Sequence, residues 1–153
     1  MPRLLIVYHS KSGQTQRMAD AVHAGATDDE IESTDVVMKQ ALEADASDLL
    51  AADGLILGTP ENFGYMSGGM KDFLDRTFYE VEGKIKPLPC GIFISAGNDG
   101  TGALTAIRRI GKGYPFIEVQ EPIIVKGVAT PDQIEACREL GLAMAIGLEA
   151  GIY

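Results

Sequence analysis

The chain has 153 residues, of which 46% are hydrophobic and 23% charged. This composition is typical of one compact globular domain and differs from that of disordered or fibrous proteins. Thirteen Lys and Arg against 22 Asp and Glu give a net charge of −9, which repels phosphate backbones and anionic membrane surfaces. We therefore expect a single domain over residues 1–153 and exclude nucleic acids and membranes as partners.

No segment predicts export or membrane insertion. The apolar run Leu140–Leu148 is about half the roughly 20 residues of a membrane-spanning helix. Near the N-terminus, Leu4–Tyr8 is too short for a secretory signal. Cys90 and Cys137 stand far apart in a chain with two His, so redox-dithiol and zinc patterns are missing. We expect a cytoplasmic protein with two buried thiols and no metal.

Apolar strand-like runs alternate with helix-period segments from end to end, the pattern of a parallel α/β sheet. The continuous apolar character of the runs indicates burial on both faces. The expected strands are Leu4–Tyr8, Thr34–Met38, Gly54–Gly58, Cys90–Ser95 and a stretch within Ile117–Val128. The expected helices begin near Thr15, Ala46, Gly69, Thr101 and Pro131. Five such units predict a doubly wound sheet and are too few for a (β/α)₈ barrel.

The first and last helices have the clearest periodicity. Apolar residues recur at helical spacing from Met18 to Gly25 and from Ile134 to Leu148, so each helix presents one apolar stripe to the sheet. Gly25 stands where a left-handed residue would end the first helix. Ligands of open parallel sheets bind beyond the carboxyl ends of the strands, where the strand order reverses. The chemistry is therefore expected in loops 9–15, 58–69 and 95–102.

The first of these loops, residues 9–15, follows a buried strand and opens a helix, so free amide N–H groups and the positive helix end point to one spot. Ser10, Ser12 and Thr15 add hydroxyl donors, and Gly13 lets the backbone curl around an anion. The glycine motifs of nucleoside triphosphate and Rossmann sites are missing, which favours a single terminal phosphate. Taken alone, this loop is equally consistent with an ordinary polar turn that uses Thr15 as helix cap.

The second loop is rich in Gly and contains Phe63 and Tyr65, which predicts stacking on a planar heterocycle. Gly64 supplies a peptide that can turn toward a ring nitrogen. The alternative is an aromatic pair that closes over the sheet edge or is buried between subunits. The third loop offers bare amides for the carbonyl edge of a pyrimidine-type ring. Glu61 and Asp99 either hold a negative field beside that ring or are solvated loop acids.

With these loops in this order, the chain resembles the flavodoxin-like family, including its flavodoxins and its NAD(P)H-dependent FMN and quinone reductases. Tyr8–Thr15 looks like the phosphate loop of the family, and Gly58–Gly68 with Met70–Asp75 looks like its second ring-binding loop and helix. The resemblance implies a three-layer α/β/α fold with a five-stranded parallel sheet of order 2-1-3-4-5. It also implies FMN as cofactor, NAD(P)H as a candidate electron donor, and a flavin that carries the chemistry without a catalytic side chain.

The resemblance carries over to the cofactor contacts residue by residue. The phosphate is assigned to Ser10, Ser12, Gly13, Gln14 and Thr15. The ring is assigned to Pro60, Glu61, Asn62, Phe63, Gly64 and Tyr65, and its pyrimidine side to Ser95, Ala96, Gly97, Asn98, Asp99 and Gly100. The chain departs from many such reductases at Asn62, where they carry an aromatic residue or Arg, and it lacks the segments that larger quinone reductases insert.

The expected function is an NAD(P)H-dependent oxidoreductase that reduces quinones, flavins or similar small acceptors. Arg108, Arg109 and Lys112 are either a contact for the 2′-phosphate of NADPH or an exposed helical face. The alternative function is a flavodoxin-type electron carrier, whose negative charge steers a basic redox protein. An interaction module without cofactor is a third possibility. Family likeness implies a homodimer or homotetramer.

Two other classes of protein with a similar arrangement of strands and helices are excluded. A phosphorylation receiver needs acidic residues where this chain has Thr59 and His9-Ser10. A low-molecular-weight phosphatase needs a nucleophilic Cys in the first loop, and residues 9–15 contain none.

Overall fold

The computed structural model describes residues 1–11 and 13–153. The sheet has the order β2-β1-β3-β5-β6, with β7 also paired to β5 and β4 to β3. The strands are β1 (Arg3–Tyr8), β2 (Asp35–Gln40), β3 (Gly54–Asn62), β4 (Tyr65–Met66), β5 (Leu88–Ala96), β6 (Phe116–Glu118) and β7 (Ile123–Lys126). The helices are α1 (Gln14–Ala26), α2 (Ala46–Ala51), α3 (Gly68–Val81), α4 (Thr101–Gly111) and α5 (Pro131–Glu149). The predicted order 2-1-3-4-5 is confirmed, with β6 and β7 together in the fifth place.

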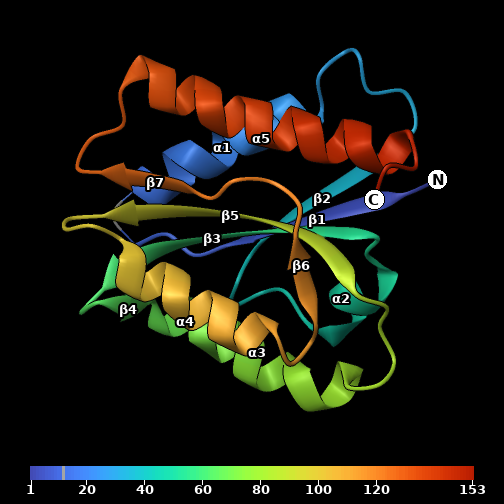
Figure 1. The fold of residues 1–153 in the computed structure, drawn as a ribbon, viewed down its shortest axis with the longest axis horizontal. Helices are drawn as coiled ribbons and strands as arrows, with labels where there is room; N and C mark the ends of the chain where they lie inside the picture. The colour runs from blue at the N-terminus through green and yellow to red at the C-terminus, as the bar shows by residue number, and fades with distance from the viewer. Residues whose placement is uncertain (12) are drawn as a thin grey trace.

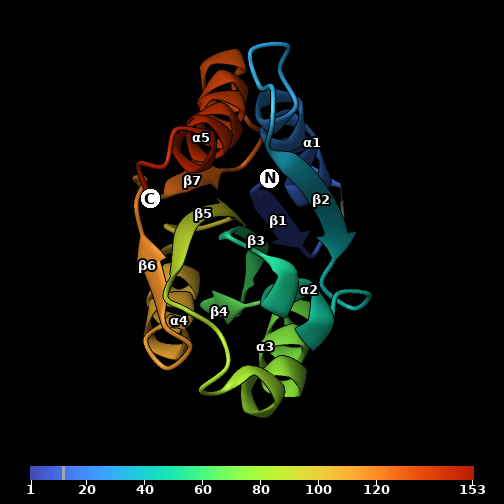
Figure 2. The same ribbon diagram turned by 90° about the vertical axis from the view of Figure 1, so that its right-hand side faces the viewer.

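Helices cover both faces of the sheet. Helices α1 and α5 lie on one face and α3 and α4 on the other (Figure 1), and the end-on view shows the twisted sheet between them (Figure 2). Along β1, Leu4 and Ile6 belong to the core under α1 and α5, whereas Leu5 and Val7 belong to the opposite core. Because both faces are buried, the strand is apolar at every position, as predicted.

Gly25 lies inside α1, so the prediction that it ends the helix is wrong. The helix continues to Ala26, with Thr27 as its C-cap. Gly25 is needed for packing, because a Cβ at this position would lie 1.8 Å from the carbonyl oxygen of Arg138 on α5. Gly141 of α5 is needed for the same reason, since a Cβ at this position would lie 1.9 Å from the carbonyl oxygen of Val22 on α1. The two glycines let the backbones of α1 and α5 touch.

The last predicted strand is split into two. Cys90 of β5 pairs with Glu118 of β6, and Phe93 of β5 pairs with Ile123 of β7. From Glu118 to Ile123 the edge segment advances five residues, whereas β5 advances three from Cys90 to Phe93. The edge segment therefore has two extra residues, which form a bulge. Pro122 lies in this bulge, where its missing N–H donor interrupts no ladder.

Both cysteines are buried free thiols, as predicted. Burial raises the pKa of the Cys137 thiol to about 11 and that of the Cys90 thiol further still. Within the described ranges 1–11 and 13–153, no helix has the length and apolar content needed to cross a bilayer.

Candidate functional site

The three predicted loops converge at the carboxyl edge of the sheet, on the left in Figure 1. The first and third loops touch through the buried side chains of Thr15 and Ser95, whose hydroxyl oxygens are 2.7 Å apart. The first loop also contacts the start of α3, where His9 Nδ1 lies 2.9 Å from Ser67 Oγ. One rim of the molecule therefore contains all three loops.

The first loop starts α1 with an uncharged cap. Ser10 Oγ accepts hydrogen bonds from the amide N–H groups of Gly13 (3.3 Å) and Gln16 (3.2 Å). Gly13 is the N-cap residue, with φ +99°, and Thr15 is 2% exposed, so the alternative interpretation of Thr15 as helix cap is wrong. Gln14 Nε2 donates to the carbonyl oxygen of Gly127 (2.9 Å). Ser12 lies outside the described residues.

The second loop is a two-residue hairpin rather than an open loop. Strand β3 continues through Asn62, which pairs antiparallel with Tyr65 of β4. The turn residues Phe63 (φ +54°) and Gly64 (φ +71°) both have the positive φ of a type I′ turn. Phe63 is fully exposed and Tyr65 is 41% exposed, so neither belongs to the core, as predicted. The hairpin thus presents two aromatic side chains and a bare glycine at the rim.

The two acidic residues of the site both cap α4. Asp99 Oδ1 accepts from the amide N–H (3.0 Å) and hydroxyl (2.9 Å) of Thr101. The Thr101 amide bond is the main cause of the lowered pKa of Asp99, followed by the Thr101 hydroxyl bond. Glu61 Oε2 accepts from the amide N–H of Ala103 (3.2 Å), which ties the hairpin to the same helix. Neither residue is simply a solvated loop acid.

These caps make the N-termini of α1 and α4, which both lie at the rim, electrostatically different. The N-terminus of α4 is neutralised by the carboxylates of Asp99 and Glu61. At α1, the cap is the hydroxyl of Ser10, and the first turn contains no acidic residue. The N-terminus of α1 therefore attracts an anion more strongly than the N-terminus of α4 does.

Each loop contains at least one glycine that faces open space. A Cβ added at Gly13, Gly64, Gly68 or Gly97 would meet no atom within 4 Å. By contrast, a Cβ at Gly102 would lie 1.9 Å from the carbonyl oxygen of Gly64, because the hairpin packs directly on α4. These open glycines leave backbone accessible to a flat ligand and its phosphate, so the rim fits the group that the sequence predicts.

The remaining predicted site residues lie along the same rim. Pro60 and Glu61 are half-buried, Ser95 and Ala96 are buried at the end of β5, and Gly100 is the N-cap of α4. Asn62, Gly64, Gly97, Asn98 and Asp99 are exposed.

Sequence reasoning missed two contacts of this site. It gave no role to His9 or Ser67, although the position of His9 directly after β1 already placed it at this edge. It also missed Gly127, which follows β7 and accepts the hydrogen bond from Gln14. Gly127 was hard to predict because the break between β6 and β7 hid the end of the last strand.

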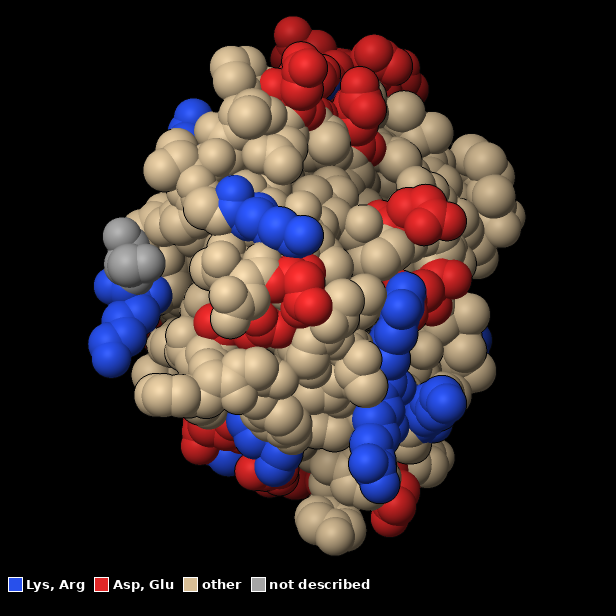
Figure 3. Space-filling model, turned by 60° about the vertical axis from the view of Figure 1, so that its left-hand side comes forward, with Lys and Arg blue, Asp and Glu red and all other residues tan. Residues whose placement is uncertain are grey.

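The basic cluster of α4 lies away from the rim. Arg108 forms a two-bond ion pair with Glu118 of β6, at 2.7 and 2.9 Å. Arg108 is seven residues beyond Thr101, the first residue of the helix, or about 10 Å along the helix axis. The exposed-face interpretation therefore holds for Arg108. At the rim itself, basic and acidic side chains are interspersed (Figure 3).

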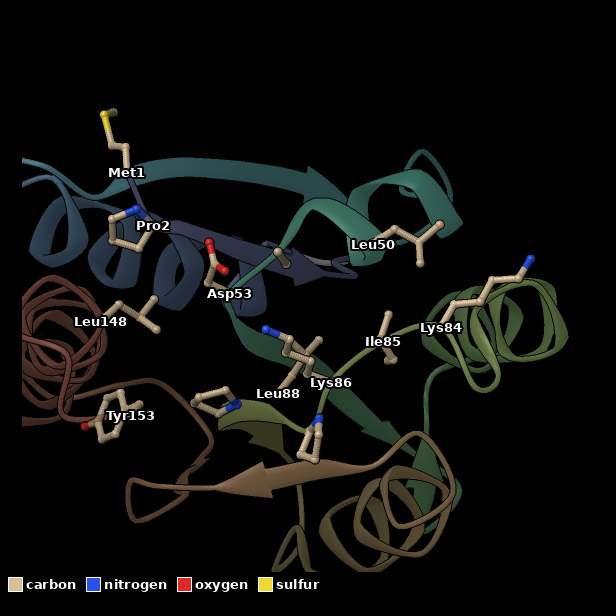
Figure 4. A pocket seen from close by; sticks show the side chains of 13 residues that line it. Met1, Pro2, Leu50, Asp53, Lys84, Ile85, Lys86, Leu88, Leu148 and Tyr153 are labelled. Atoms are coloured by element: carbon tan, nitrogen blue, oxygen red, sulfur yellow. The ribbon is translucent and has the colours of Figure 1, made fainter.

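A cavity of about 620 Å³ lies at the opposite edge of the sheet. Pro2, Asp53 and Leu88 line it near the amino ends of the strands, together with Leu148 and Tyr153 near the C-terminus (Figure 4). None of the residues that line this cavity comes from the three loops. It is therefore a separate feature from the candidate site.

The chain is similar to several known redox proteins. It is 31% identical to a flavodoxin of Aquifex aeolicus over 95% of this chain and 86% of the relative. It is 34% identical to an NAD(P)H dehydrogenase (quinone) of Geobacter sulfurreducens over 80% of this chain and 70% of that protein.

Solved structures have the same fold at lower identity. An archaeal flavodoxin superposes with a TM-score of 0.82 at 21% identity, over 96% of this chain and 99% of the other. Rubredoxin oxygen:oxidoreductase of Desulfovibrio gigas also superposes with a TM-score of 0.82, at 19% identity, over 98% of this chain but 37% of that longer one. The family described as NADPH-dependent FMN reductase matches residues 14–127. The chain therefore belongs to this family and has the flavodoxin-like fold.

Proposed function

We propose that the chain binds FMN at the carboxyl edge of its sheet and acts as an NAD(P)H-dependent oxidoreductase on quinones, flavins or similar small acceptors. The observation that carries this proposal is the convergence of three loops, each with a glycine whose Cα faces open space. The quinone dehydrogenases among the relatives and the FMN reductase family support the reaction class.

Each loop then has a separate task. Amides in the first turn of α1, with Gly13, Gln14 and the hydroxyls of Ser10 and Ser12, hold the phosphate. Phe63 and Tyr65 cover the ring, and backbone at 97–99 meets its pyrimidine edge. Thr15 acts indirectly, because its hydroxyl is bonded to Ser95. When bound, FMN supplies hydride and electron transfer, while the chain binds, orients and shields it.

A visible spectrum tests cofactor binding. The purified protein should be yellow and release FMN on denaturation, or take up FMN when it is added. A colourless protein that does not take up FMN contradicts the proposal. Addition of NADPH without oxygen should then bleach the flavin absorbance.

A second candidate function is that of an electron carrier. It is favoured by the similarity to the Aquifex aeolicus flavodoxin, which extends over 95% of this chain. NADPH oxidation that saturates with menadione as acceptor supports the enzyme. Slow turnover that does not saturate supports the carrier, which needs a protein partner.

Replacement of Gly97 by Ala tests the assigned ring edge. The added methyl group meets no protein atom within 4 Å, so the melting temperature of the flavin-free protein should be unchanged. We expect the dissociation constant for FMN to rise roughly tenfold, or about 1.4 kcal/mol, because the methyl group occupies the space of the ring. The control is Gly113→Ala, two residues beyond the C-terminal end of α4, where a Cβ makes ordinary contacts at 3.4 Å. Unchanged affinity in G97A would remove this loop from the site.

A further inference from the structure

His9, the first residue of the first loop, packs against the start of α3. Its amide N–H donates to the carbonyl oxygen of Gly58 at 3.0 Å, and its ring lies against Gly69, where a Cβ would come within 2.5 Å of Cδ2. Nδ1 is 2.9 Å from Ser67 Oγ. A side chain of the phosphate loop is thus held by the helix that follows the ring-binding hairpin.

A chain of hydrogen bonds continues from Ser67 into the hairpin. Ser67 Oγ caps α3 by accepting from the amide N–H of Met70 (3.2 Å). The Ser67 amide N–H donates to Thr59 Oγ1 (3.0 Å), and Thr59 Oγ1 lies 2.8 Å from the carbonyl oxygen of Pro60. Ser67 and Thr59 are 0% exposed. The path therefore links His9 to Pro60, where the predicted ring contacts begin.

The contact between His9 and Ser67 exists in either tautomer of the imidazole. With a bare Nδ1, the Ser67 hydroxyl donates to His9 and the Thr59 hydroxyl donates to Pro60. With the proton on Nδ1, His9 donates to Ser67 Oγ, and the Thr59 hydroxyl lies 3.2 Å from the same oxygen as a donor. The link between the first loop and the start of α3 therefore does not depend on the tautomer.

We propose that His9 is a positioning residue, which sets the spacing between the phosphate loop and the hairpin through Ser67 and does not contact the phosphate itself. This inference rests on the proposed function. It follows that loss of the Nδ1 contact weakens binding of the ring as well as of the phosphate. Riboflavin, which has the ring and no phosphate, should therefore lose affinity as well.

The test uses two substitutions at His9. His9→Phe keeps a flat ring against Gly69 and removes Nδ1, whereas His9→Asn keeps a short polar group that can donate or accept. We expect H9F to raise the dissociation constants for FMN and riboflavin about three- to tenfold, as for loss of one hydrogen bond. H9N should restore most of the affinity. His23→Phe, the same change at the other histidine, serves as control.

A second measurement does not depend on flavin. In the flavin-free protein, H9F should speed hydrogen exchange of the Met70 amide, because the Ser67 hydroxyl that caps this amide loses its contact with His9. Ser67→Ala removes the same contact from the other side, so the effects of H9F and S67A on both dissociation constants should be less than additive. S67A also supplies the test should H9F fail to fold.

Three outcomes overturn the inference. If H9F weakens FMN and spares riboflavin, His9 contacts the phosphate. If both dissociation constants and the Met70 exchange rate stay unchanged, His9 positions nothing. If the effects of H9F and S67A add fully, the bond between them is not the cause. A wild-type protein that binds neither flavin defeats the proposed function instead, a result visible before any variant is made.

Discussion

Phe63 has a backbone conformation that bulky residues avoid. Its φ of +54° places it in the left-handed region, which costs an L residue about 1–2 kcal/mol. No packing offsets this cost, because the side chain is fully exposed. Type I′ turns prefer Asn at this position. Strained residues of this kind gather at functional sites, in agreement with the role proposed for Phe63 in ring binding.

Replacement of Phe63 by Asn should therefore separate stability from binding. We expect the flavin-free protein to gain about 1 kcal/mol, or roughly 2–4 °C in melting temperature. The dissociation constant for FMN should rise several-fold, since an aromatic stacking contact contributes about 0.5–1.5 kcal/mol. Differential scanning fluorimetry and flavin titration measure the two effects. Phe63→Leu should weaken FMN without the gain in stability, and a variant F63N that binds FMN normally would exclude stacking by Phe63.

At the site, residue types were easier to predict than their partners. Glycines and hydroxyls at the ends of strands indicated a phosphate and a ring. The sequence did not indicate that Thr15 points inward to Ser95, or that Glu61 caps α4. These contacts join residues 80 and 42 positions apart, and a local pattern contains no information on which distant partner a side chain meets.

At the scale of elements, the contact between α1 and α5 depends on glycine at both sides. Gly25 and Gly141 were predicted as helix positions on apolar stripes, and both are buried there. Periodicity shows which side of a helix faces the core. It does not show that two helices approach closely enough to exclude a methyl group, which is why Gly25 was misinterpreted as a helix end.

Replacement of Gly141 by Ala should destabilise the protein although Ala favours helix. The intrinsic gain is about 1 kcal/mol, but the methyl group would lie 1.9 Å from the carbonyl oxygen of Val22. Because a backbone carbonyl cannot move aside, we expect a net loss of about 1–3 kcal/mol. Urea unfolding followed by circular dichroism measures it. In Gly147→Ala on the same helix, the atoms nearest to the methyl group belong to the side chain of Tyr153 rather than to backbone, so this change should cost less; equal losses would exclude the close helix contact as the cause.

At the scale of the whole molecule, Glu149 ties the C-terminal helix to the loop before β2. Its Oε1 accepts hydrogen bonds from the amide N–H groups of Glu32 (3.0 Å) and Thr34 (3.1 Å) and from both the amide and hydroxyl of Ser33. The Ser33 amide is the main cause of the lowered pKa of Glu149. A carboxyl whose pKa is lowered by folding stabilises the protein above its unfolded pKa, about 4.3, and this stabilisation is lost as the pH falls through the folded pKa.

Replacement of Glu149 by Gln should lower the melting temperature at pH 7. It should also flatten the dependence of the melting temperature on pH below about 5, because the titrating group is gone. The two proteins should therefore become more alike in acid. Thermal unfolding from pH 3 to 7 tests this, with Glu135→Gln on the exposed side of α5 as control. A constant difference between E149Q and wild type at all pH values would contradict the assignment.

The strands and helices were predictable because continuous apolar runs and helical stripes repeat along the chain, whereas the strand order and the three layers were implied by the resemblance to the flavodoxin-like family. The split of the last strand was not predictable, since the bulge before Ile123 differs from its flanking strands only by a few polar residues and Pro122.

That split has a consequence for contacts between molecules. An uncovered outer strand offers unpaired N–H and C=O groups to a neighbouring chain, and long regular edges of this kind aggregate. Here one border of the sheet is formed by β6, with three residues, and β7, with four residues, and a bulge lies between them. This border is too short and too irregular for a second copy of the chain to add a strand to it. Strand pairing between two copies of this chain is therefore disfavoured at the border formed by β6 and β7.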